Sequence, residues 1–391
     1  MVADLNRDVT NRSLILVDEA NRFSPPTCRR LIVKVGSALL VSPQGEVHSE
    51  WVETLVADIA GRAQAGQQVA IVSSGAIALG ARRLGLPGGG RNSLEDAQAA
   101  AATGQIALAH MWSDLLSQRG MTAAQVLVTL DDLEDRRRYL NASATLSRLL
   151  GLGVIPIINE NDTVATERIR FGDNDRLAAR VGQAAGADGV ILLSDIDGLY
   201  DSNPQSNPDA KLIPVVPTIT WEIESMADNK SSSGMGSGGM VSKIEAAKIA
   251  NMAGMDLAII SGHGPHALAR FTHTGHGTVF LGEGTPSARE AWIAGGLTSG
   301  GTIRIDEGAA KALRTGNSLL AAGVTSVEGN FHRGDIVDIV GPDGRRIARG
   351  LCEYDSSASR LIIGKRSEEL GAILGHAPRS ALVHRNHMAL V

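Results

Sequence analysis

Two groups of polar residues stand close together in the middle of the chain, and their side chains are of the kind that binds cations. The first, residues 159–162, reads Asn-Glu-Asn-Asp and follows an apolar run that begins at Val154. The second, residues 173–175, reads Asp-Asn-Asp and precedes a helix-forming segment. Hydrogen-bond acceptors at the end of a buried strand indicate a ligand site, because open α/β sheets bind ligands at the carboxyl ends of their strands. A polar loop with helix-capping residues has the same composition.

Two lysines occupy positions that call for an anion nearby. Lys34 falls inside the apolar segment 31–37, where a lysine needs either a partner or the strand edge. Lys243 follows the serine- and glycine-rich segment 231–240. A glycine-rich loop that leads into a helix can cradle phosphate, because its N–H groups and the helix dipole point at the anion. Taken alone, Lys34 equally suits a lysine that snorkels at a strand edge, and a serine- and glycine-rich run is more often a linker.

Polar residues also follow two other predicted strands. Residues 73–76, Ser-Ser-Gly-Ala, form a turn that exposes backbone N–H groups, and Ser194 and Asp195 follow a further apolar run. Lysines, a phosphate loop and strand-end carboxylates together suit phosphoryl transfer, which needs cations on the transferring group and carboxylates that hold Mg²⁺ or orient the cations. These residues leave the acceptor open, because a small acidic metabolite and a nucleotide monophosphate both suit them.

The segments that carry these residues alternate between two patterns. Apolar runs of strand length recur at 31–37, 69–72, 124–130, 154–158, 189–193 and 256–260. Amphipathic or alanine-rich segments predict helices at 50–65, 93–118, 139–150, 175–187 and 244–254. Such alternation predicts a doubly wound, mostly parallel α/β sheet, whose strand ends meet at one edge.

The chain is expected to form more than one domain. We predict a flexible extension over residues 1–28, which are polar and contain prolines, and an α/β domain over residues 29–285. A linker over residues 286–299 leads to a small β-rich domain over residues 300–391. Short apolar segments between glycine-rich turns support the last assignment, at 302–305, 335–340, 347–351 and 361–363.

The composition limits the class of protein. With 391 residues, 43% of them hydrophobic and 20% charged, the chain suits a globular protein of two or three domains. A net charge of −5 gives no general attraction to nucleic acid or anionic membranes, so small metabolites are the expected partners. Cys28 and Cys352 match no metal-ligand spacing and no disulfide framework. The chain shows neither a long apolar run nor a signal-like N-terminus, so we expect a cytoplasmic protein with no membrane partner.

Six segments, in this order, resemble a known family. They read IVKVGSALL, VAIVSSGAIALG, VIPIINENDTVA, FGDNDRLAA, ILLSDIDGLY and GSGGMVSKIEAA. Over residues 30–285 they resemble the glutamate 5-kinase family of the amino acid kinase superfamily, and the tail, with VEGNFHRGDIVDIVG, IARGL and ALVHRNHM, resembles a PUA domain. The resemblance implies an amino acid kinase fold followed by a small PUA-like barrel. It also implies an enzyme that uses ATP and Mg²⁺ to phosphorylate the γ-carboxylate of L-glutamate. The product is glutamyl 5-phosphate, and the reaction is the first step of proline biosynthesis.

The resemblance also implies a catalytic set and an ATP site. Lys34 and Lys243 would stabilise the phosphoryl group in transfer, and Asp175 would orient the two lysines. The residues implied in ATP binding are Lys34, Ser194, Asp195, Ser237, Gly238, Gly239, Met240, Val241, Ser242 and Lys243. No protein metal site is implied, because Mg²⁺ arrives with ATP. Asp173 is a secondary candidate, either for organising the ion or for loop structure.

For the substrate, the resemblance implies three binding residues. Ser74, Asp162 and Asn174 match glutamate-binding positions, and Asp162 suits the α-ammonium group. The connecting segment 163–172 is a candidate substrate lid. Family members are commonly inhibited by proline, form dimers or tetramers, and act before a glutamyl phosphate reductase, so the resemblance implies these partners as well.

Two alternatives stand beside this reading. Another kinase of the superfamily, acting on N-acetylglutamate, aspartate, carbamate or uridine monophosphate, is the nearer one. Asp162 argues against acylated or amine-free acceptors, which bring no ammonium group to meet its carboxylate. The other is an RNA-binding protein led by its PUA-like tail. Residues 297–391 hold 12 Lys and Arg against 10 Asp and Glu, too even a balance to indicate an RNA surface, and RNA contact stays unproven.

Overall fold

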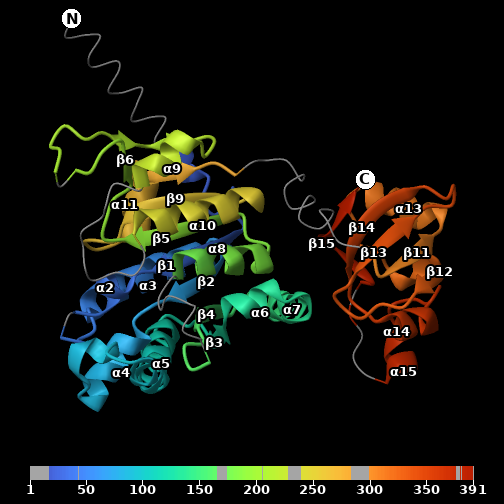
Figure 1. The fold of residues 1–391 in the computed structure, drawn as a ribbon, viewed down its shortest axis with the longest axis horizontal. Coiled ribbons are helices and arrows are strands. Elements are labelled where there is room, and N and C mark those ends of the chain that lie inside the picture. The colour runs from blue at the N-terminus through green and yellow to red at the C-terminus, as the bar shows by residue number, and fades with distance from the viewer. Residues whose placement is uncertain are drawn as a thin grey trace, which may run out of the picture. The chain divides into compact units, whose positions relative to one another are not determined.

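The computed structural model describes residues 17–42, 44–164, 174–204, 206–227, 239–282, 299–375, 379 and 381–390. The chain divides into two compact units, the first comprising Met1–Glu134 and Ala142–Glu283 and the second Asp135–Asn141 and Gly284–Val391 (Figure 1). Residues 283–298 lie outside the described part, so the domain limits expected at 285 and 300 stay a prediction. No helix in the described ranges is long and apolar enough to span a bilayer.

The described residues of the first unit form an eight-stranded sheet. Its strands are β1 (Arg30–Val35), β2 (Gln68–Ser73), β3 (Ala123–Val128), β4 (Ile155–Glu160), β5 (Gly189–Ser194), β8 (Val215–Val216), β9 (Asp256–Ser261) and β10 (Thr278–Phe280). They lie in the order β3-β4-β2-β1-β5-β9-β10-β8, and β9 and β10 are the antiparallel pair in an otherwise parallel sheet. The predicted doubly wound, mostly parallel sheet is confirmed. A separate hairpin pairs β6 (Leu199–Tyr200) with β7 (Leu212–Ile213).

Helices connect the strands and cover both faces of the sheet (Figure 1). They are α2 (Ser37–Leu40), α3 (Ser49–Gln64), α4 (Ala76–Leu84), the short η1 (Pro87–Gly90), α5 (Leu94–Ser117), α6 (Leu130–Glu134), α7 (Arg136–Gly151), α8 (Asn174–Ala185), α9 (Trp221–Ala227), α10 (Met240–Met252) and α11 (Ala267–Thr274). α8 and α10 pack against each other and the sheet, while α3 packs against β2 and α11.

Alternation along β1 determines where its lysine points. Successive side chains of a strand face opposite sides of the sheet. Leu31, Val33 and Val35 are buried in a core cluster shared with α3. Lys34 therefore faces the other side, where its charge meets α8.

Two glycines bring α4 and α5 into backbone contact. A Cβ atom on Gly80 would lie 1.8 Å from the carbonyl oxygen of Ala100, and one on Gly104 would lie 1.8 Å from that of Ala76. Atoms cannot pack that closely, so the two helices can cross here only because both positions are glycine. α5 is thereby held against the start of α4, with Gln105 next to the crossing.

Residues 17–28, which we call the N-terminal strap, are packed into the first unit. Residues 17–21 are helical, and Phe23 and Cys28 are fully buried. The ring of Phe23 lies 5.8 Å from that of Phe271, centroid to centroid. The predicted flexible extension is therefore wrong for the strap, because one aromatic residue in a polar stretch supplies an anchor without any periodic pattern. Residues 1–16 lie outside the described part.

Two buried polar side chains hold the strap in place. Arg62 on α3 donates a hydrogen bond to the carbonyl oxygen of Phe23 at 2.8 Å. Gln67 donates to the carbonyl oxygens of Phe23 at 3.0 Å and Cys28 at 2.6 Å. The strap thus satisfies donors that would otherwise be buried without acceptors.

The described part of the second unit contains a five-stranded sheet in the order β12-β11-β13-β14-β15. Its elements are β11 (Gly301–Ile305), α13 (Glu307–Arg314), η2 (Ala321–Gly323), β12 (Val324–Gly329), β13 (Ile336–Val340), β14 (Arg346–Cys352), α14 (Ser356–Leu361), α15 (Leu370–Leu374) and β15 (Val383–Leu390). The predicted β-rich tail is confirmed. The strand expected at 361–363 is wrong, because Asp355 caps a helix there by accepting from the N–H of Ala358 at 2.8 Å.

Candidate active site

Three charged side chains from three elements meet in the first unit. Lys34 Nζ on β1 lies 2.6 Å from Asp175 Oδ1, and Lys243 Nζ on α10 lies 2.9 Å from Asp175 Oδ2. All three residues are buried, Asp175 to 1% exposure. Lysines are seldom buried unless they are paired, and the shared carboxylate supplies that partner. The structure brings together the two lysines and the aspartate that the sequence singled out.

The charges of this cluster are interdependent. Burial would raise the pKa of the Asp175 carboxyl, but the charges and hydrogen bonds of Lys34 and Lys243 outweigh burial and hold that pKa below its ordinary value. The carboxylate is therefore ionised at neutral pH. Two lysines against one carboxylate leave one excess positive charge, which is felt strongly where water is excluded. The cluster can therefore stabilise an anion.

A small cavity of about 40 Å³ lies at the carboxyl ends of β2 and β4. Its lining residues are Ser37, Ser74, Gly75, Ala76, Ile77, Ala78, Arg91, Asn159, Glu160, Asp162 and Asn174. The three residues implied in substrate binding, Ser74, Asp162 and Asn174, are all among them. The first turn of α8 joins this cavity to the charged cluster, because Asn174 lines the cavity and Asp175 holds the lysines.

Amide side chains link the cavity wall into a network. Nδ2 of Asn174 donates to Oγ of Ser74 at 2.7 Å and to Oδ1 of Asn159 at 3.2 Å. Nδ2 of Asn159 in turn donates to Oε1 of Gln105 on α5 at 2.8 Å. Oδ1 of Asn174 is buried, and the described residues give it no hydrogen-bond partner. The wall therefore presents an acceptor oxygen that a ligand can satisfy.

Asp162 is an acidic group of this wall that burial deprives of solvent. Burial raises the pKa of its carboxyl to about 6, although the positive charge of Arg91 partly offsets the effect. At neutral pH the carboxylate is still ionised, in a poorly solvated position. An ammonium group entering the cavity would relieve that cost, while Arg91 can meet an anionic group.

The residues implied in ATP binding are partly described. Ser194 ends β5, and its buried hydroxyl donates to Oδ1 of Asp195 at 3.0 Å. Gly239 caps the N-terminus of α10, and the first turn of that helix consists of Met240, Val241, Ser242 and Lys243. The remaining predicted residues, Ser237, Gly238 and Asp173, lie outside the described part, as do residues 165–172 of the candidate lid.

Sequence reasoning did not find Arg91 and Gln105. Arg91 follows the glycine turn of η1 and has no pattern that separates it from a surface arginine. Gln105 lies in an alanine-rich helix but shares a buried stripe with Leu108 and Trp112, three and seven residues on. A polar residue on an apolar helix stripe was the one signal that could have identified it.

Within the described ranges, no group of three or more His, Cys, Asp or Glu side chains is arranged to hold a metal ion. Asp175 is already engaged by two lysines. Mg²⁺ is usually held by one or two carboxylates together with substrate phosphates.

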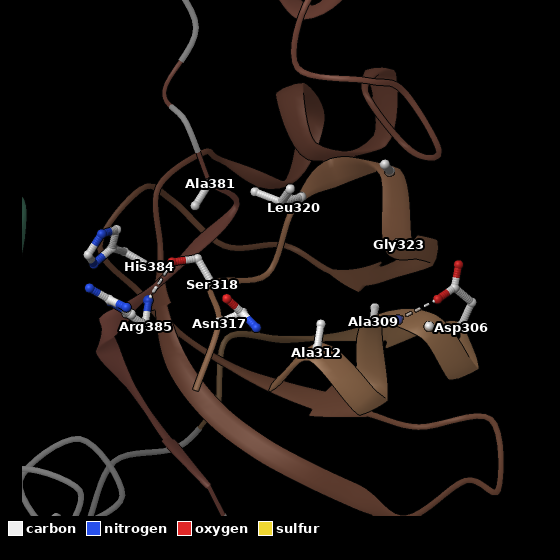
Figure 2. A pocket seen from close by; sticks show the side chains of 12 residues that line it. Asp306, Ala309, Ala312, Asn317, Ser318, Leu320, Gly323, Ala381, His384 and Arg385 are labelled. Carbon is white, nitrogen blue, oxygen red and sulfur yellow. Dashed lines mark hydrogen bonds between the residues drawn. The ribbon is translucent and has the colours of Figure 1, made fainter. Parts of the chain in front are cut away.

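A larger cavity, of about 680 Å³, lies in the second unit (Figure 2). Its walls are largely small and apolar, and polar side chains gather at one end, namely Asn317, Ser318, His384 and Arg385 (Figure 2). Asp306 stands at the other end, where it caps α13 by accepting from the N–H of Ala309 at 2.7 Å. The lining has neither paired lysines nor a buried carboxylate between them, so its size does not make it a site for phosphoryl transfer.

Comparisons with known proteins identify the relatives of both units. The chain matches the model of the amino acid kinase family over residues 29–261 and that of the PUA domain over residues 301–374. A glutamate 5-kinase of Sphingopyxis alaskensis is 65% identical over 369 residues, which cover 94% of this chain and 99% of that protein. A glutamate 5-kinase of Zymomonas mobilis is 56% identical over 397 positions and 100% of both chains. One from Novosphingobium aromaticivorans is 60% identical over 93% of this chain and 97% of its own.

Proposed function

Because the chain belongs to the glutamate 5-kinase family, we propose that it transfers the terminal phosphoryl group of ATP to the γ-carboxylate of L-glutamate. The product, glutamyl 5-phosphate, is an acyl phosphate and would enter proline biosynthesis. The observation that carries this proposal is the pair of buried lysines on one buried carboxylate, beside a cavity lined with acid and amide groups.

Lys34 and Lys243 take the role of cations on the transferring group. Phosphoryl transfer is accelerated mainly by positioning and by charge stabilisation, since there is little covalent chemistry for the protein to perform. Asp175 keeps two like charges close together without net repulsion between them. Because each of its oxygens is ion-paired with one lysine, it also fixes where each ammonium group lies.

The cavity takes the role of the amino-acid site. Asp162 and Oδ1 of Asn174 would receive the α-ammonium group, and Ser74 and Arg91 are suited to a carboxylate. The cavity, at about 40 Å³, has room for little more than one water molecule. Glutamate is larger, so its entry requires side chains around the cavity to move.

ATP would be held by Ser194, Asp195 and residues 237–243, at the end of β5 and the start of α10. Mg²⁺ enters with ATP as part of the substrate and neutralises phosphate charge there. Inhibition by proline belongs to the same proposal, because proline resembles a cyclised glutamate skeleton and carries an amine and a carboxylate. A homo-oligomeric state and coupling to a glutamyl phosphate reductase follow from the family resemblance alone.

A hydroxylamine-trapping assay tests the reaction directly. Hydroxylamine converts an acyl phosphate to a coloured hydroxamate, so ATP-dependent colour with glutamate reports the proposed product. Aspartate and N-acetylglutamate, run in parallel, are expected to react far more slowly. Aspartate is one methylene shorter, and N-acetylglutamate has no ammonium group for Asp162.

Equal rates with N-acetylglutamate and glutamate would overturn the substrate assignment. Proline is added in the same assay over a range of glutamate concentrations. We expect it to raise the KM for glutamate, and no effect on KM or kcat at saturating proline would rule out the inhibitor.

A further inference from the structure

We propose that Gln105, on α5, is a positioning residue that holds Asn159, and through it Asn174, in the orientation that gives the amino-acid cavity its polarity, a role that rests on the proposed glutamate kinase function. Gln105 is buried but does not line the cavity. It acts through Asn159, whose side chain lies between α5 and the first turn of α8.

A backbone group fixes the direction of the whole network. The N–H of Glu160 donates to Oδ1 of Asn159 at 2.9 Å, and a backbone N–H can only donate. That atom of Asn159 is therefore the carbonyl oxygen, and its amino group faces the other way. The amino group meets Gln105, so the atom of Gln105 at 2.8 Å must be an acceptor. No other assignment of these two amides satisfies both contacts.

The same oxygen of Asn159 determines how Asn174 is turned. It accepts from Nδ2 of Asn174 at 3.2 Å, so Oδ1 of Asn174 points away from it. Asn174 is 3% exposed, and nothing in the described part of the chain donates to this oxygen. Buried acceptors are normally paired, so the oxygen is set to receive a donor from a ligand.

The donor and acceptor roles of Asn174 also determine that of Ser74. Its hydroxyl oxygen accepts from Nδ2 of Asn174 at 2.7 Å and therefore keeps its own proton for another acceptor. The cavity thus offers an acceptor at Asn174, near the carboxylate of Asp162, and a donor at Ser74. An α-amino acid carries the complementary pair, an ammonium group and a carboxylate. An acid without the amine can use only half of this arrangement.

α5 is held so that Gln105 reaches Asn159. The glycine at position 104 lets the helix backbone touch the start of α4. Two turns on, Nε1 of Trp112 donates to Oγ of Ser73 at 3.0 Å, next to Ser74. One helix therefore contacts the ends of both β2 and β4. Without the acceptor of Gln105, the amino group of Asn159 would be buried with no partner, and the orientation of Asn174 would lose its support.

Two variants and a control test the role in the hydroxamate assay. Gln105→Leu removes the acceptor at similar volume, and Gln105→Glu keeps an oxygen that can accept from Asn159. Leu116→Val, a buried position on the same helix stripe, controls for general loosening of α5. The substrates are glutamate and glutarate, which differ in the α-ammonium group.

For Gln105→Leu we expect the KM for glutamate to rise about tenfold and the KM for ATP to stay within about twofold, as loss of one oriented hydrogen bond to a charged group implies. The preference for glutamate over glutarate in kcat/KM should fall by a similar factor. Gln105→Glu should recover most of the affinity for glutamate and most of the preference for glutamate over glutarate. Leu116→Val should change neither of these two quantities.

Equal losses with glutamate and glutarate would show that Gln105 is only structural and would overturn the inference. Unchanged selectivity in Gln105→Leu would overturn it as well. A wild-type enzyme that fails to phosphorylate glutamate at all would instead overturn the proposed function. The wild-type rate therefore tests the proposed function, and the selectivity of the variants tests the role of Gln105.

Discussion

At the residue scale, neighbouring positions on one helix serve two different sites. Asn174 faces the amino-acid cavity and Asp175 faces the lysines, although they are adjacent in sequence. Consecutive residues of an α-helix point about 100° apart, so the first turn of α8 can present each to a different neighbour. In the proposed reaction the acceptor and the phosphoryl group must meet, and this single turn places the groups proposed to bind them next to each other.

The cationic role proposed for Lys243 predicts an effect on the reaction rate. Lys243→Ala should lower kcat by about a hundredfold or more, because a cation that acts in the transition state is lost. Lys248→Ala on the same helix is the matched control, since Lys248 pairs with Glu224 and Glu245 at the surface. Steady-state kinetics with both substrates varied distinguishes the outcomes. A rise in the KM for ATP at unchanged kcat would reassign Lys243 to ground-state nucleotide binding.

Asp162 predicts a pH dependence with a definite sign. Burial raises its pKa to about 6, so the carboxylate proposed to meet the ammonium group is lost as pH falls through that value. The kcat/KM for glutamate should therefore fall about tenfold per unit below about pH 6, since kcat/KM reports groups of the free enzyme. Asp162→Asn should abolish this fall in kcat/KM and should lower kcat/KM at pH values above about 6. A wild-type profile flat down to about pH 5 would contradict the role.

The ionised carboxylate of Asp162, which is expected to favour activity, is expected to lower the stability of the fold. A raised pKa means that folding favours the protonated form, so ionised Asp162 destabilises the protein above about pH 6, and the effect fades as pH falls toward 4. Asp162→Asn should therefore raise the melting temperature more at about pH 8 than at about pH 4.

At the scale of elements, the sequence predicted the strands and helices well and their contacts poorly. The strand expected at 189–193 is Gly189–Ser194, and the helix expected at 93–118 is Leu94–Ser117. Buried strands and long helices leave periodic apolar patterns that a sequence shows directly. The crossing of α4 and α5 leaves none, because a glycine in a helical pattern indicates only a weaker helix. Gln105 was missed because its partner, Asn159, is 54 residues away in sequence.

The crossing predicts opposite effects of the same substitution at two glycines. Gly104→Ala places a Cβ atom 1.8 Å from the carbonyl oxygen of Ala76, so α5 must shift. We expect a loss of about 1–3 kcal/mol in the free energy of unfolding and a higher KM for glutamate as Gln105 moves. Gly61→Ala on α3 meets nothing within 4 Å and should instead stabilise by about 0.5–1 kcal/mol. Urea unfolding measures both, and equal stabilisation would show that the two helices do not touch.

At the scale of the whole molecule, each unit has its own core. The core of the first unit includes the N-terminal strap through Phe23 and Cys28, and a separate core in the second unit includes Phe331. The family resemblance was enough to predict a kinase unit and a PUA unit. It could not predict the strap, which lies outside the segments that carry the resemblance. Phe23 stands there as one aromatic among polar residues, and its place in the fold is revealed by its burial and by the acceptor it brings to Arg62 and Gln67.

Two fully buried phenylalanines, one in each core, form a matched pair that tests this separation. Phe23→Ala should remove about 3–5 kcal/mol from the first unit, because a large buried ring is replaced by a cavity. Kinase activity should then be lost at a lower temperature than in the wild type. Phe331→Ala removes the same ring from the second unit, and it should shift a calorimetric transition without changing the temperature at which activity is lost. Equal shifts of activity loss in both variants would mean that the two cores unfold as one, since damage to either would then open the active site.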